Sequence, residues 1–224
     1  MPVAASAQSL QCTVPATLPL PHADLPTRDQ PARRLPIGSY TLALTWSPEY
    51  CRTARRDPAD RMQCGGGNRF GFTLHGLWPD GTGATWPQYC GAAAILAPRT
   101  LRATLCATPS VQLMQHEWAK HGTCMPGETP DGYFAKARAR YERLRFPDMM
   151  ALSRRPLTAG VLAQAIARAN PGIAPGMMRI TAKRGGWLDE VWLCLDTALR
   201  YRSCPTHQGG LPATARLRIW RGGR

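Results

Sequence analysis

The chain has 224 residues, of which 44% are hydrophobic, and this suits one large globular domain or at most two small ones with a substantial core. No apolar run approaches the roughly 20 residues that a membrane-spanning helix needs, so we expect no membrane anchor. The net charge of +14 favours polyanionic partners such as nucleic acid or anionic lipid, although a solvated basic surface explains the same composition equally well.

Eight cysteines are spread along the chain, and no two of them form a C-x-x-C pair. An even number with this spacing indicates four disulfides rather than a metal cluster. Disulfides persist in oxidising compartments, so we expect a secreted or periplasmic protein. The opening "MPVAASAQ" lacks the charged and apolar regions of a signal peptide and resembles only its small-residue end. This favours a mature form with an added Met, or a misassigned start.

The first part of the chain is rich in proline. Residues 13–36 contain six prolines, which fix φ and remove backbone donors. We therefore expect an extended arm over residues 1–37, tied down through Cys12, and one folded domain over residues 38–224.

Two strands and a loop are expected next. The β-branched and aromatic stretch "SYTLALTW" (39–46) predicts a strand. The polar segment 49–68, between Cys51 and Cys64, is interpreted as a loop. "RFGFTLHGLW" (69–78) predicts a second strand, which ends at the turn signal of residues 78–81.

Three helices and a late hairpin follow. The first helix should begin at the N-cap Ser110 and stop before Gly122. The second should run from near Asp131 to Pro147, and the third from Thr158 to residue 170, with an apolar face that includes residues 161, 162, 166 and 169. Stretches 177–183 and 187–196 flank two glycines and predict a hairpin, and 215–220 a last strand. These elements indicate a single α+β domain, a central antiparallel sheet packed with helices and stapled by disulfides.

The stretch "HEWAKHGTC" (116–124) concentrates reactive side chains on the first helix. With His116 at 0°, Lys120, Glu117 and His121 fall at about 40°, 100° and 140°, so the four share one arc, and Trp118 lies on the opposite, core-facing side. We interpret the arc as a wet reactive face. A purely solvated face, held by i,i+4 pairs, is the alternative.

A metal site fits this stretch poorly. The zincin motif places two histidines at i and i+4, whereas His116 and His121 are at i and i+5 and diverge by about 140°. Lys120, in the same arc, would repel a cation. A lysine beside imidazoles suits a phosphate instead, because the lysine supplies charge and the imidazoles exchange protons near neutral pH.

A third histidine, His75, lies in "FTLHGLWPD" (72–80). A phosphodiester next to a 2′-hydroxyl can be cleaved without a metal if one group takes the hydroxyl proton, another protonates the leaving oxygen and a cation stabilises the developing charge. Three histidines and a lysine supply these groups, and the positive charge of the chain would attract RNA.

The two segments resemble the active-site segments of the ribonuclease T2 family, in the same order. Weaker similarities lie in "LTWSPEYC", "TWPQYC" and "VWLCLD" followed by "SCP", so the resemblance covers roughly residues 38 to 205. It implies an endoribonuclease acting on single-stranded RNA, with 2′,3′-cyclic phosphates and then 3′-phosphates as products. It also implies no cofactor or metal, low base specificity and an acid to mildly acid optimum.

The resemblance also implies roles for five residues. His75 matches the general acid for the 5′-oxygen, and His121 matches the general base for the 2′-hydroxyl, with the roles exchanged during hydrolysis. His116 matches the histidine that binds phosphate. Glu117 and Lys120 match the pair that stabilises the pentacovalent phosphate.

Base recognition is implied at three further positions. Trp78 matches an aromatic residue that stacks on the base, and Asp80 matches a position that accepts from the adenine amino group. Trp86 is a candidate second stacking wall. Core packing of the two tryptophans is the alternative. We expect RNA as the partner, a monomer, and no membrane association.

The resemblance implies two disulfides, Cys90–Cys124 and Cys194–Cys204. For the other four cysteines, Cys51–Cys64 is the local choice, which leaves Cys12–Cys106 to staple the arm; a plant-like pattern would instead join Cys64 to Cys106. Two rival functions stay open, a non-catalytic RNA- or anion-binding protein on the same fold and, less favoured by the histidine spacing, a metal-dependent hydrolase.

Overall fold

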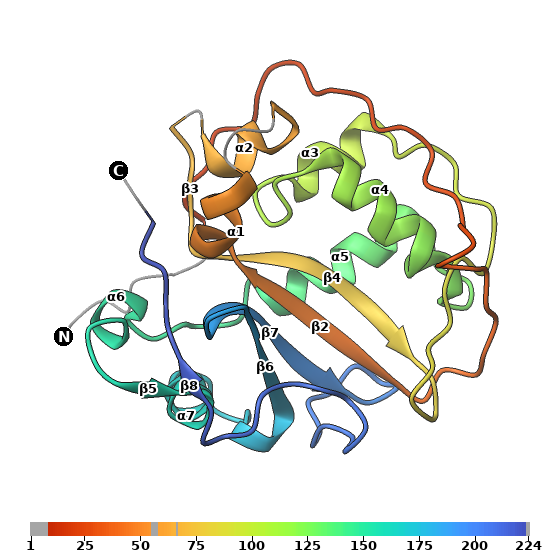
Figure 1. The fold of residues 1–224 in the computed structure, drawn as a ribbon. Coiled ribbons are helices and arrows are strands. Elements are labelled where there is room, and N and C mark those ends of the chain that lie inside the picture. Colours follow the sequence, from red (N-terminus) through yellow and green to blue (C-terminus); the bar gives the residue numbers. More distant parts are fainter. Residues whose placement is uncertain (1–8, 55–57, 66, 223–224) are drawn as a thin grey trace.

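A four-stranded antiparallel sheet, in the order β4-β2-β7-β6, runs through the middle of the molecule (Figure 1). This computed structural model describes residues 9–54, 58–65 and 67–222. Strands and helices mix within one α+β domain, as the sequence predicts. The sheet strands are β2 (Ser39–Trp46), β4 (Phe72–Asp80), β6 (Met178–Lys183) and β7 (Trp187–Leu195).

The remaining elements are short strands, helices and single 3₁₀ turns. Two small antiparallel pairs, β1 with β3 and β5 with β8, lie outside the main sheet. The elements are β1 (Ser9–Gln11), α1 (Ser47–Ala54), η1 (Pro58–Asp60), α2 (Arg61–Cys64), β3 (Arg69–Phe70), α3 (Pro98–Thr104), α4 (Val111–Lys120), η2 (Gly122–Cys124), α5 (Pro130–Tyr141), α6 (Met149–Leu152), β5 (Leu157–Thr158), α7 (Ala159–Ala169), η3 (Pro175–Met177) and β8 (Arg216–Leu217).

Helices pack at both ends of the main sheet. On the β4 side, α4 and α5 contact β4 directly, and α3 packs on α5 (Figure 1). On the opposite side, α7 contacts β6. The inner faces of these helices, with Met114, Tyr133 and Leu162 fully buried, join the strands in one hydrophobic core. The α4 helix is therefore held rigidly beside β4, the strand that carries the first histidine segment.

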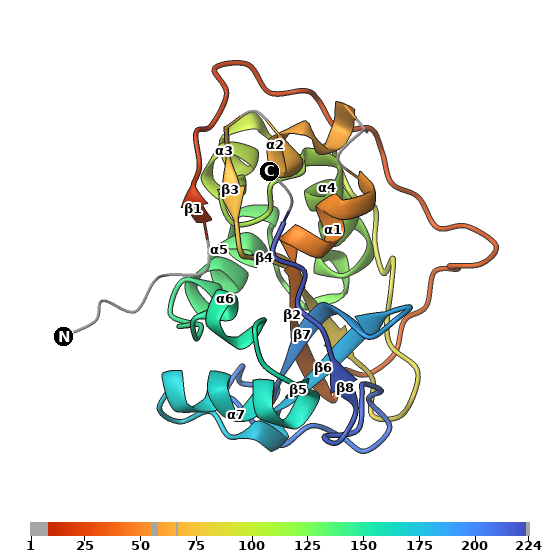
Figure 2. The same cartoon turned by 60° about the vertical axis from the view of Figure 1, so that its left-hand side comes forward.

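The proline-rich arm wraps around the outside of this unit. Figures 1 and 2 show residues 12–36 as a long segment that passes α3 and α4 and returns to β2. It contains no helix and only one isolated bridge, between Arg33 and Gln88. The Cys12–Cys106 disulfide fixes its beginning. Residues 12–36 thus follow the protein surface as an extended segment, a surface strap.

The segment 49–68 is not the polar loop that its sequence indicates. It carries the end of α1, η1 and α2 in its described residues. The inner faces of these helices bury polar groups: Glu49 is buried, and Nε2 of Gln63 donates to Oγ of Ser47 at 3.0 Å. A helix that buries polar side chains has no apolar periodicity to reveal it. Helices α3 and α6 were also not predicted from the sequence.

The three predicted helices are present, with differences at their ends. Ser110 and Thr158 act as N-caps, accepting from the backbone N–H groups of Leu113 and Val161. The second helix ends at Tyr141, six residues before Pro147. Val161 is exposed rather than part of the buried face of α7. The predicted hairpin is β6–β7, and the predicted last strand shortens to β8.

Four disulfides join all eight cysteines, and Cys64 pairs with Cys51 rather than with Cys106. Four disulfides are consistent with an extracellular compartment. Within the described ranges, no helix combines the length and apolar character that a membrane crossing requires. The pairs are Cys12–Cys106, Cys51–Cys64, Cys90–Cys124 and Cys194–Cys204.

Candidate active site

A β-bulge in β4 directs His75 toward the site. On the neighbouring strand β2, Ala43 pairs with Gly76 and Leu44 pairs with Leu74, so His75 is the extra residue in the ladder. An extra residue shifts the alternation of side chains along a strand and redirects the bulged side chain. His75 is partly exposed as a result, whereas its neighbours Leu74 and Gly76 are buried.

The bulge brings His75 and Trp78 together. Residues three positions apart on a regular strand point to opposite faces, yet these two rings meet edge to face with centroids 5.0 Å apart. Trp78 also contacts Trp192 of β7, with a centroid distance of 5.7 Å. The open face of the sheet therefore carries a row of aromatic and imidazole rings.

Glu190 of β7 is a partner of His75 that the sequence analysis missed. Its Oε1 accepts from Nδ1 of His75 at 2.6 Å and from Oγ1 of Thr45 at 2.9 Å, and its Oε2 accepts from Nε1 of Trp192 at 2.7 Å. A carboxylate only accepts, so the hydrogen on Nδ1 of His75 is fixed and Nε2 is the nitrogen left for other partners. An acidic residue within the apolar strand "WLDEVWLCL", two positions from Trp192, is the signal that could have identified it.

Glu117 of α4 lies on the other side of His75. Its Oε1 is 3.4 Å from Nε2 of His75, and its Oε2 accepts from Nε1 of Trp78 at 2.8 Å. Gly76 makes this approach possible, because a Cβ at that position would overlap the Glu117 carboxylate. The helix α4 and the strand β4 are thus joined through one buried carboxylate.

The prediction that four residues of α4 form a solvent-exposed face is wrong for two of them. Glu117 is 1% exposed and His121 is 6% exposed, because this side of the helix packs against β4 instead of facing solvent. Trp118 is buried on the core side, as the helical geometry predicts. The four side chains still share one side of the helix, and the structure brings them together with His75.

His116 is held from outside the helix. Its Nδ1 hydrogen-bonds to Oδ2 of Asp24, a residue of the N-terminal arm, and the hydroxyl of Tyr89 donates to Oδ1 of the same carboxylate at 3.2 Å. Burial, with the nearby Asp24 charge, raises the pKa of Tyr89 to about 12. This contact between the arm and the site was not predicted from the sequence.

Lys120 and His121 complete the set at the C-terminal end of α4. The imidazole of His121 stacks on Trp78 with ring centroids 5.6 Å apart, and its Nδ1 is buried with no hydrogen-bond partner among the described residues. Burial lowers the pKa of Lys120, although the charges of Glu117 and Asp24 partly oppose this. An enclosed nitrogen cannot meet a substrate, so proton exchange with a substrate falls to Nε2 of His121.

The environments of the two histidines displace their pKa values in opposite directions. Burial lowers the pKa of His121 well below its ordinary value, and the positive charge of Lys120 lowers it further. Burial also opposes protonation of His75, but the hydrogen bond to Glu190 and the charge of Glu117 outweigh it and raise the pKa of His75. Burial raises the pKa of Glu117 despite its cationic neighbours. His75 is suited to donate a proton and His121 to accept one.

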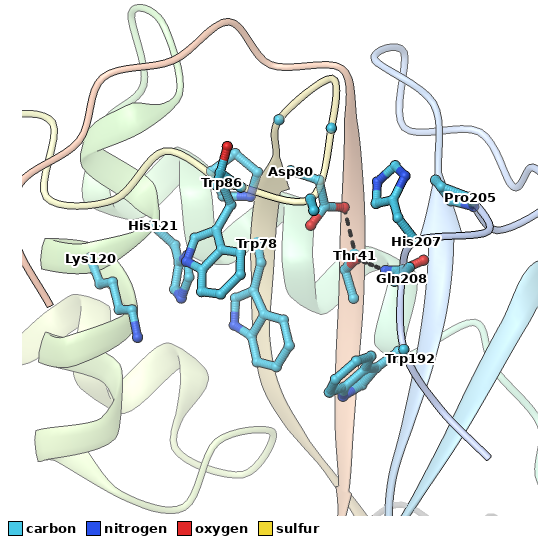
Figure 3. Close-up of a pocket in the computed structure, with 16 residues that line it drawn as sticks. Thr41, Trp78, Asp80, Trp86, Lys120, His121, Trp192, Pro205, His207 and Gln208 are labelled. Carbon is cyan, nitrogen blue, oxygen red and sulfur yellow. Dashed lines mark hydrogen bonds between the residues drawn. The ribbon is translucent and has the colours of Figure 1, made fainter. Parts of the chain in front are cut away.

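A cavity of about 430 Å³ adjoins these groups (Figure 3). The three predicted base-binding residues, Trp78, Asp80 and Trp86, line it together with Lys120 and His121. Trp86 is 44% exposed, which excludes core packing for this residue. Further lining residues that the sequence analysis did not identify are Thr41, Trp192, His207 and Gln208.

The polar wall of the cavity is a hydrogen-bonded series. Oγ1 of Thr41 donates to Oδ2 of Asp80 at 2.8 Å and accepts from Nε2 of Gln208. Burial raises the pKa of Asp80, although the hydrogen bonds from Thr41 and Ser39 oppose this effect. One carboxylate oxygen of Asp80 is therefore engaged by the protein, and the side chain faces the cavity (Figure 3).

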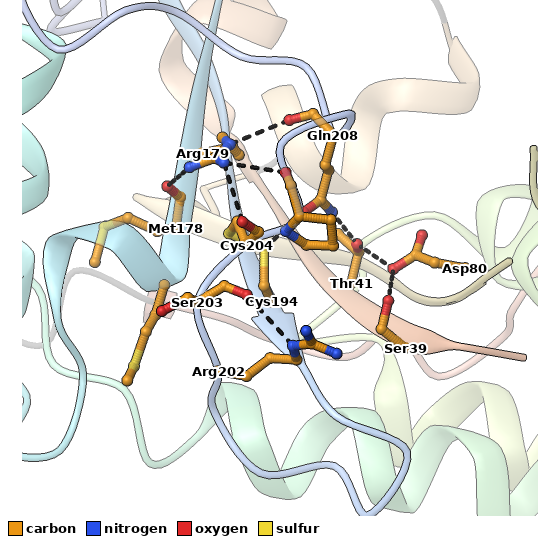
Figure 4. The surroundings of a disulfide bond; sticks show 12 residues. Ser39, Thr41, Asp80, Met178, Arg179, Cys194, Arg202, Ser203, Cys204 and Gln208 are labelled. Carbon is orange, nitrogen blue, oxygen red and sulfur yellow. Dashed lines mark hydrogen bonds between the residues drawn. A yellow bond between two sulfur atoms is a disulfide. The ribbon is translucent and has the colours of Figure 1, made fainter. Parts of the chain in front are cut away.

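Residues that do not line the cavity fix the loop that carries His207 and Gln208. The Cys194–Cys204 disulfide ties its start to β7, and the guanidinium of Arg179 donates to the carbonyl groups of Cys204, residue 205 and Gln208 (Figure 4). These bonds replace the regular secondary structure that the loop lacks. The cavity wall is thus part of the rigid framework.

Comparisons with known proteins agree with this architecture. The family model described as "Ribonuclease T2 family" matches residues 37–204. The chain is 30% identical over 182 residues to a "Probable ribonuclease" of Haemophilus influenzae, covering 76% of this chain but only 62% of that protein. It is 36% identical over 163 residues to a "Ribonuclease" of Aeromonas hydrophila, covering 70% of this chain and 71% of that one.

Solved structures share the fold. The "RNase-related protein from Calystegia sepium" superposes with a TM-score of 0.63 at 24% identity, covering 81% of this chain and 96% of that one. The crystal structure of "RNase NT in complex with 5'-AMP" superposes with a TM-score of 0.62 at 22% identity, covering 82% and 98%.

Proposed function

The chain belongs to the ribonuclease T2 family, and from this premise we propose that it is an endoribonuclease that cleaves single-stranded RNA without a metal ion. The observation that carries the proposal is the placement of His75 and His121 on either side of Trp78, with ring centroids 5.0 and 5.6 Å from it, in environments that displace their pKa values in opposite directions. Cleavage by transphosphorylation needs an acid and a base that coexist at the same pH, and such environments supply them.

In the first step, neutral His121 removes the proton from the 2′-hydroxyl, and the 2′-oxygen attacks the adjacent phosphorus. His75, protonated, donates its proton to the 5′-oxygen as the bond from phosphorus to that oxygen breaks. The products are a 2′,3′-cyclic phosphate and a free 5′-hydroxyl. At the end of the step His121 carries the proton and His75 is neutral.

In the second step the two histidines exchange roles. Neutral His75 removes a proton from water, the water oxygen attacks the cyclic phosphate, and His121 returns its proton to the 2′-oxygen. The product is a 3′-phosphate, and both histidines regain their starting protonation states. No group other than water is consumed, so the cycle needs no cofactor.

Negative charge develops on the phosphorane between these two proton transfers. Lys120 provides positive charge and N–H donors on the α4 side, His116 can donate from Nε2 when its ring carries a second hydrogen, and the partial burial of the site strengthens these interactions. We assign His116 to phosphate binding and Lys120 to stabilisation of the phosphorane. Glu117, buried between His75 and Trp78, holds these two rings and balances the local positive charge.

The cavity beside His121 is proposed as the site of the base. Trp78 and Trp86 offer aromatic faces, and stacking on aromatic rings accepts every base, which supports low base specificity. Asp80 offers an acceptor for an exocyclic amino group. The structural relative RNase NT was crystallised with 5′-AMP, which supports a nucleotide as the occupant.

The setting of the reaction follows from the same features. We propose a secreted or periplasmic monomer, with residues 1–37 as an arm and residues 38–224 as the catalytic domain. The four disulfides support an oxidising compartment. The net charge of +14 supports a polyanionic substrate.

The decisive experiment is digestion of single-stranded RNA in excess EDTA from acid to neutral pH, with a DNA control and analysis of the new ends. RNA cleavage that gives first 2′,3′-cyclic and then 3′-phosphate ends is the expected result. The H75F/H121F double variant should bind RNA but not cleave it. Loss of cleavage in EDTA with recovery on adding a divalent metal would overturn the metal-independent mechanism.

A further inference from the structure

Asp24 connects the N-terminal arm to the candidate phosphate site. One of its carboxylate oxygens hydrogen-bonds Nδ1 of His116, and the other accepts from the hydroxyl of Tyr89 at 3.2 Å. The Asp24 side chain is only 18% exposed, although it belongs to a surface strap. It lies outside residues 37–204, which the family model matches, so nothing in that match assigns it a role.

The arm is anchored close to Asp24. Two residues before it, the backbone N–H of His22 donates to Oε1 of Gln112 at 3.0 Å, and its carbonyl accepts from Nε2 of Gln112 at 3.2 Å. Gln112 lies one helical turn before His116, on the same side of α4. These two hydrogen bonds fix the position of the arm along the axis of α4, so that Asp24 lies beside His116.

The arm is anchored again after Asp24. Arg33 exchanges two backbone hydrogen bonds with Gln88, at 2.8 and 2.9 Å, and the side-chain amide of Gln88 donates to the carbonyl of residue 31 at 2.8 Å. Together with the Cys12–Cys106 disulfide, these contacts fix the arm on both sides of Asp24. The carboxylate is therefore held in place before any substrate binds.

The position of Tyr89 is also fixed by its contacts with the rest of the chain. Its backbone N–H donates to the carbonyl of Lys120 at 2.8 Å, and its φ of 50° is unusual for a residue with a side chain. The Cys90–Cys124 disulfide follows immediately and ties this turn to the end of α4. The ring of Tyr89 lies edge-on to His116 at 6.4 Å. The Asp24 carboxylate is thus bonded by Tyr89 through Oδ1 and by His116 through Oδ2.

The hydrogen bond determines which nitrogen of His116 is available. A carboxylate accepts but does not donate, so Nδ1 must carry the hydrogen in the contact with Asp24. Nε2 makes no hydrogen bond within the described part of the chain, and the side chain is 30% exposed. Nε2 is therefore the nitrogen left for a phosphate oxygen, to which it donates when the ring also carries a hydrogen on Nε2, and the arm sets its orientation.

We propose that Asp24 is a positioning residue that fixes the ring orientation and Nδ1–H state of His116, so that the arm is part of the catalytic unit. This inference rests on the phosphate-binding role proposed for His116. Removal of the group that orients a metal-ligating histidine typically costs about 10- to 100-fold in affinity or activity, and we take the same range for a histidine oriented toward phosphate. We expect a loss of that size in kcat/KM when the carboxylate is replaced.

The test compares D24N with D29N in the full, oxidised chain. Asn keeps the volume of Asp24 and can either donate or accept, so it no longer enforces one state of Nδ1. Asp29 lies on the same arm and is exposed, so D29N removes the same charge without touching His116. The readouts are long-range ¹H–¹⁵N NMR of the His116 imidazole, titration with inorganic phosphate, and kcat and KM on a dinucleoside phosphate across pH.

In wild type and D29N, neutral His116 should show the Nδ1–H state, and D24N should show a mixture. D24N should also bind inorganic phosphate more weakly and lose about 10- to 100-fold in kcat/KM. An unchanged imidazole spectrum in D24N would overturn the proposal, and so would phosphate binding as tight as in D29N. The NMR readout does not depend on cleavage. An inactive wild type would therefore refute the proposed function, while the imidazole spectra of wild type, D24N and D29N would still decide the role of Asp24.

A further variant separates positioning from general docking of the arm. Q112A removes the anchor at His22 but leaves Asp24 and His116 intact. It should retain the Nδ1–H state and lose less kcat/KM than D24N. If Q112A lost as much activity with an unchanged His116 spectrum, arm docking rather than the Asp24 carboxylate would be responsible, and the proposal would be wrong.

Discussion

Nδ1 of His75 donates to Oε1 of Glu190 at 2.6 Å, so a carboxylate on β7 reaches past the intervening strand β2 to orient an imidazole on β4. Trp192 and Thr45 hold the same carboxylate from two other directions. Burial opposes ionisation of Glu190, but the hydrogen bond and the charge of His75 outweigh it and lower the pKa of Glu190. An ionised Glu190 favours a protonated His75, the state needed in a general acid.

Replacing Glu190 by Gln should move the alkaline limb of the pH–rate profile to lower pH. The charge and hydrogen bond of Glu190 raise the pKa of His75, so their loss lowers that pKa, and His75 gives up its proton at a lower pH. Above the optimum, kcat/KM should fall about tenfold or more, since general acid catalysis contributes roughly 10²–10⁴-fold. The profile of kcat/KM against pH for a dinucleoside phosphate measures this. E142Q, at an exposed helix end, is the matched control and should leave the profile unchanged.

The wild-type profile of kcat/KM should be bell-shaped, with its limbs assigned to the two histidines. The base must be neutral, so activity rises with pH through the lowered pKa of His121. The acid must be protonated, so activity falls through the raised pKa of His75. Removing the positive charge of Lys120 in K120M should move the acid limb to higher pH while lowering the maximum. An acid limb that stays in place in K120M would argue against His121 as the base.

Much of the fold could be predicted because its signals are local. Ser110 and Thr158 cap helices through their own side chains, and the paired glycines at 185 and 186 take positive φ values in the hairpin. The helices of segment 49–68 escaped detection because they bury polar groups such as Glu49. Hydrophobic periodicity reveals helices whose buried face is apolar, whereas the buried face of these helices is polar.

The candidate site was predictable where its residues share a segment. The geometry of one helix brings His116, Lys120 and His121 together, and that geometry follows from spacing. The partners Asp24 and Glu190 come from an arm and a distant strand, and their proximity depends on tertiary packing that no local pattern encodes. The bulge at His75 was equally hidden, because it is defined only by the pairing with β2.

Gly76 should tolerate no side chain. A Cβ there would overlap the carboxylate of Glu117 and lie 2.9 Å from Nε1 of Trp78, so G76A must displace α4 or rotate the carboxylate. We expect a loss of about 1–3 kcal/mol in the free energy of unfolding, typical of overpacking in a close-packed site, and a larger relative loss of activity. Chemical denaturation and steady-state kinetics measure the two effects. G176A is the control, since a Cβ at Gly176 meets open space and should change neither.

Trp86 should contribute to substrate binding and little to stability. Its ring is 44% exposed in the cavity wall, under the guanidinium of Arg33 and bonded through Nε1 to Gln88. Stacking of a base on an aromatic ring is worth about 1–3 kcal/mol, so W86A should raise KM about 5- to 150-fold for every base. W86F keeps an aromatic face and should recover most of the affinity. W78F is the contrasting variant. Trp78 also donates a hydrogen bond to Glu117, and loss of that bond should lower kcat. A KM in W86A equal to that of wild type would remove Trp86 from the base site and leave Trp78 as the stacking residue.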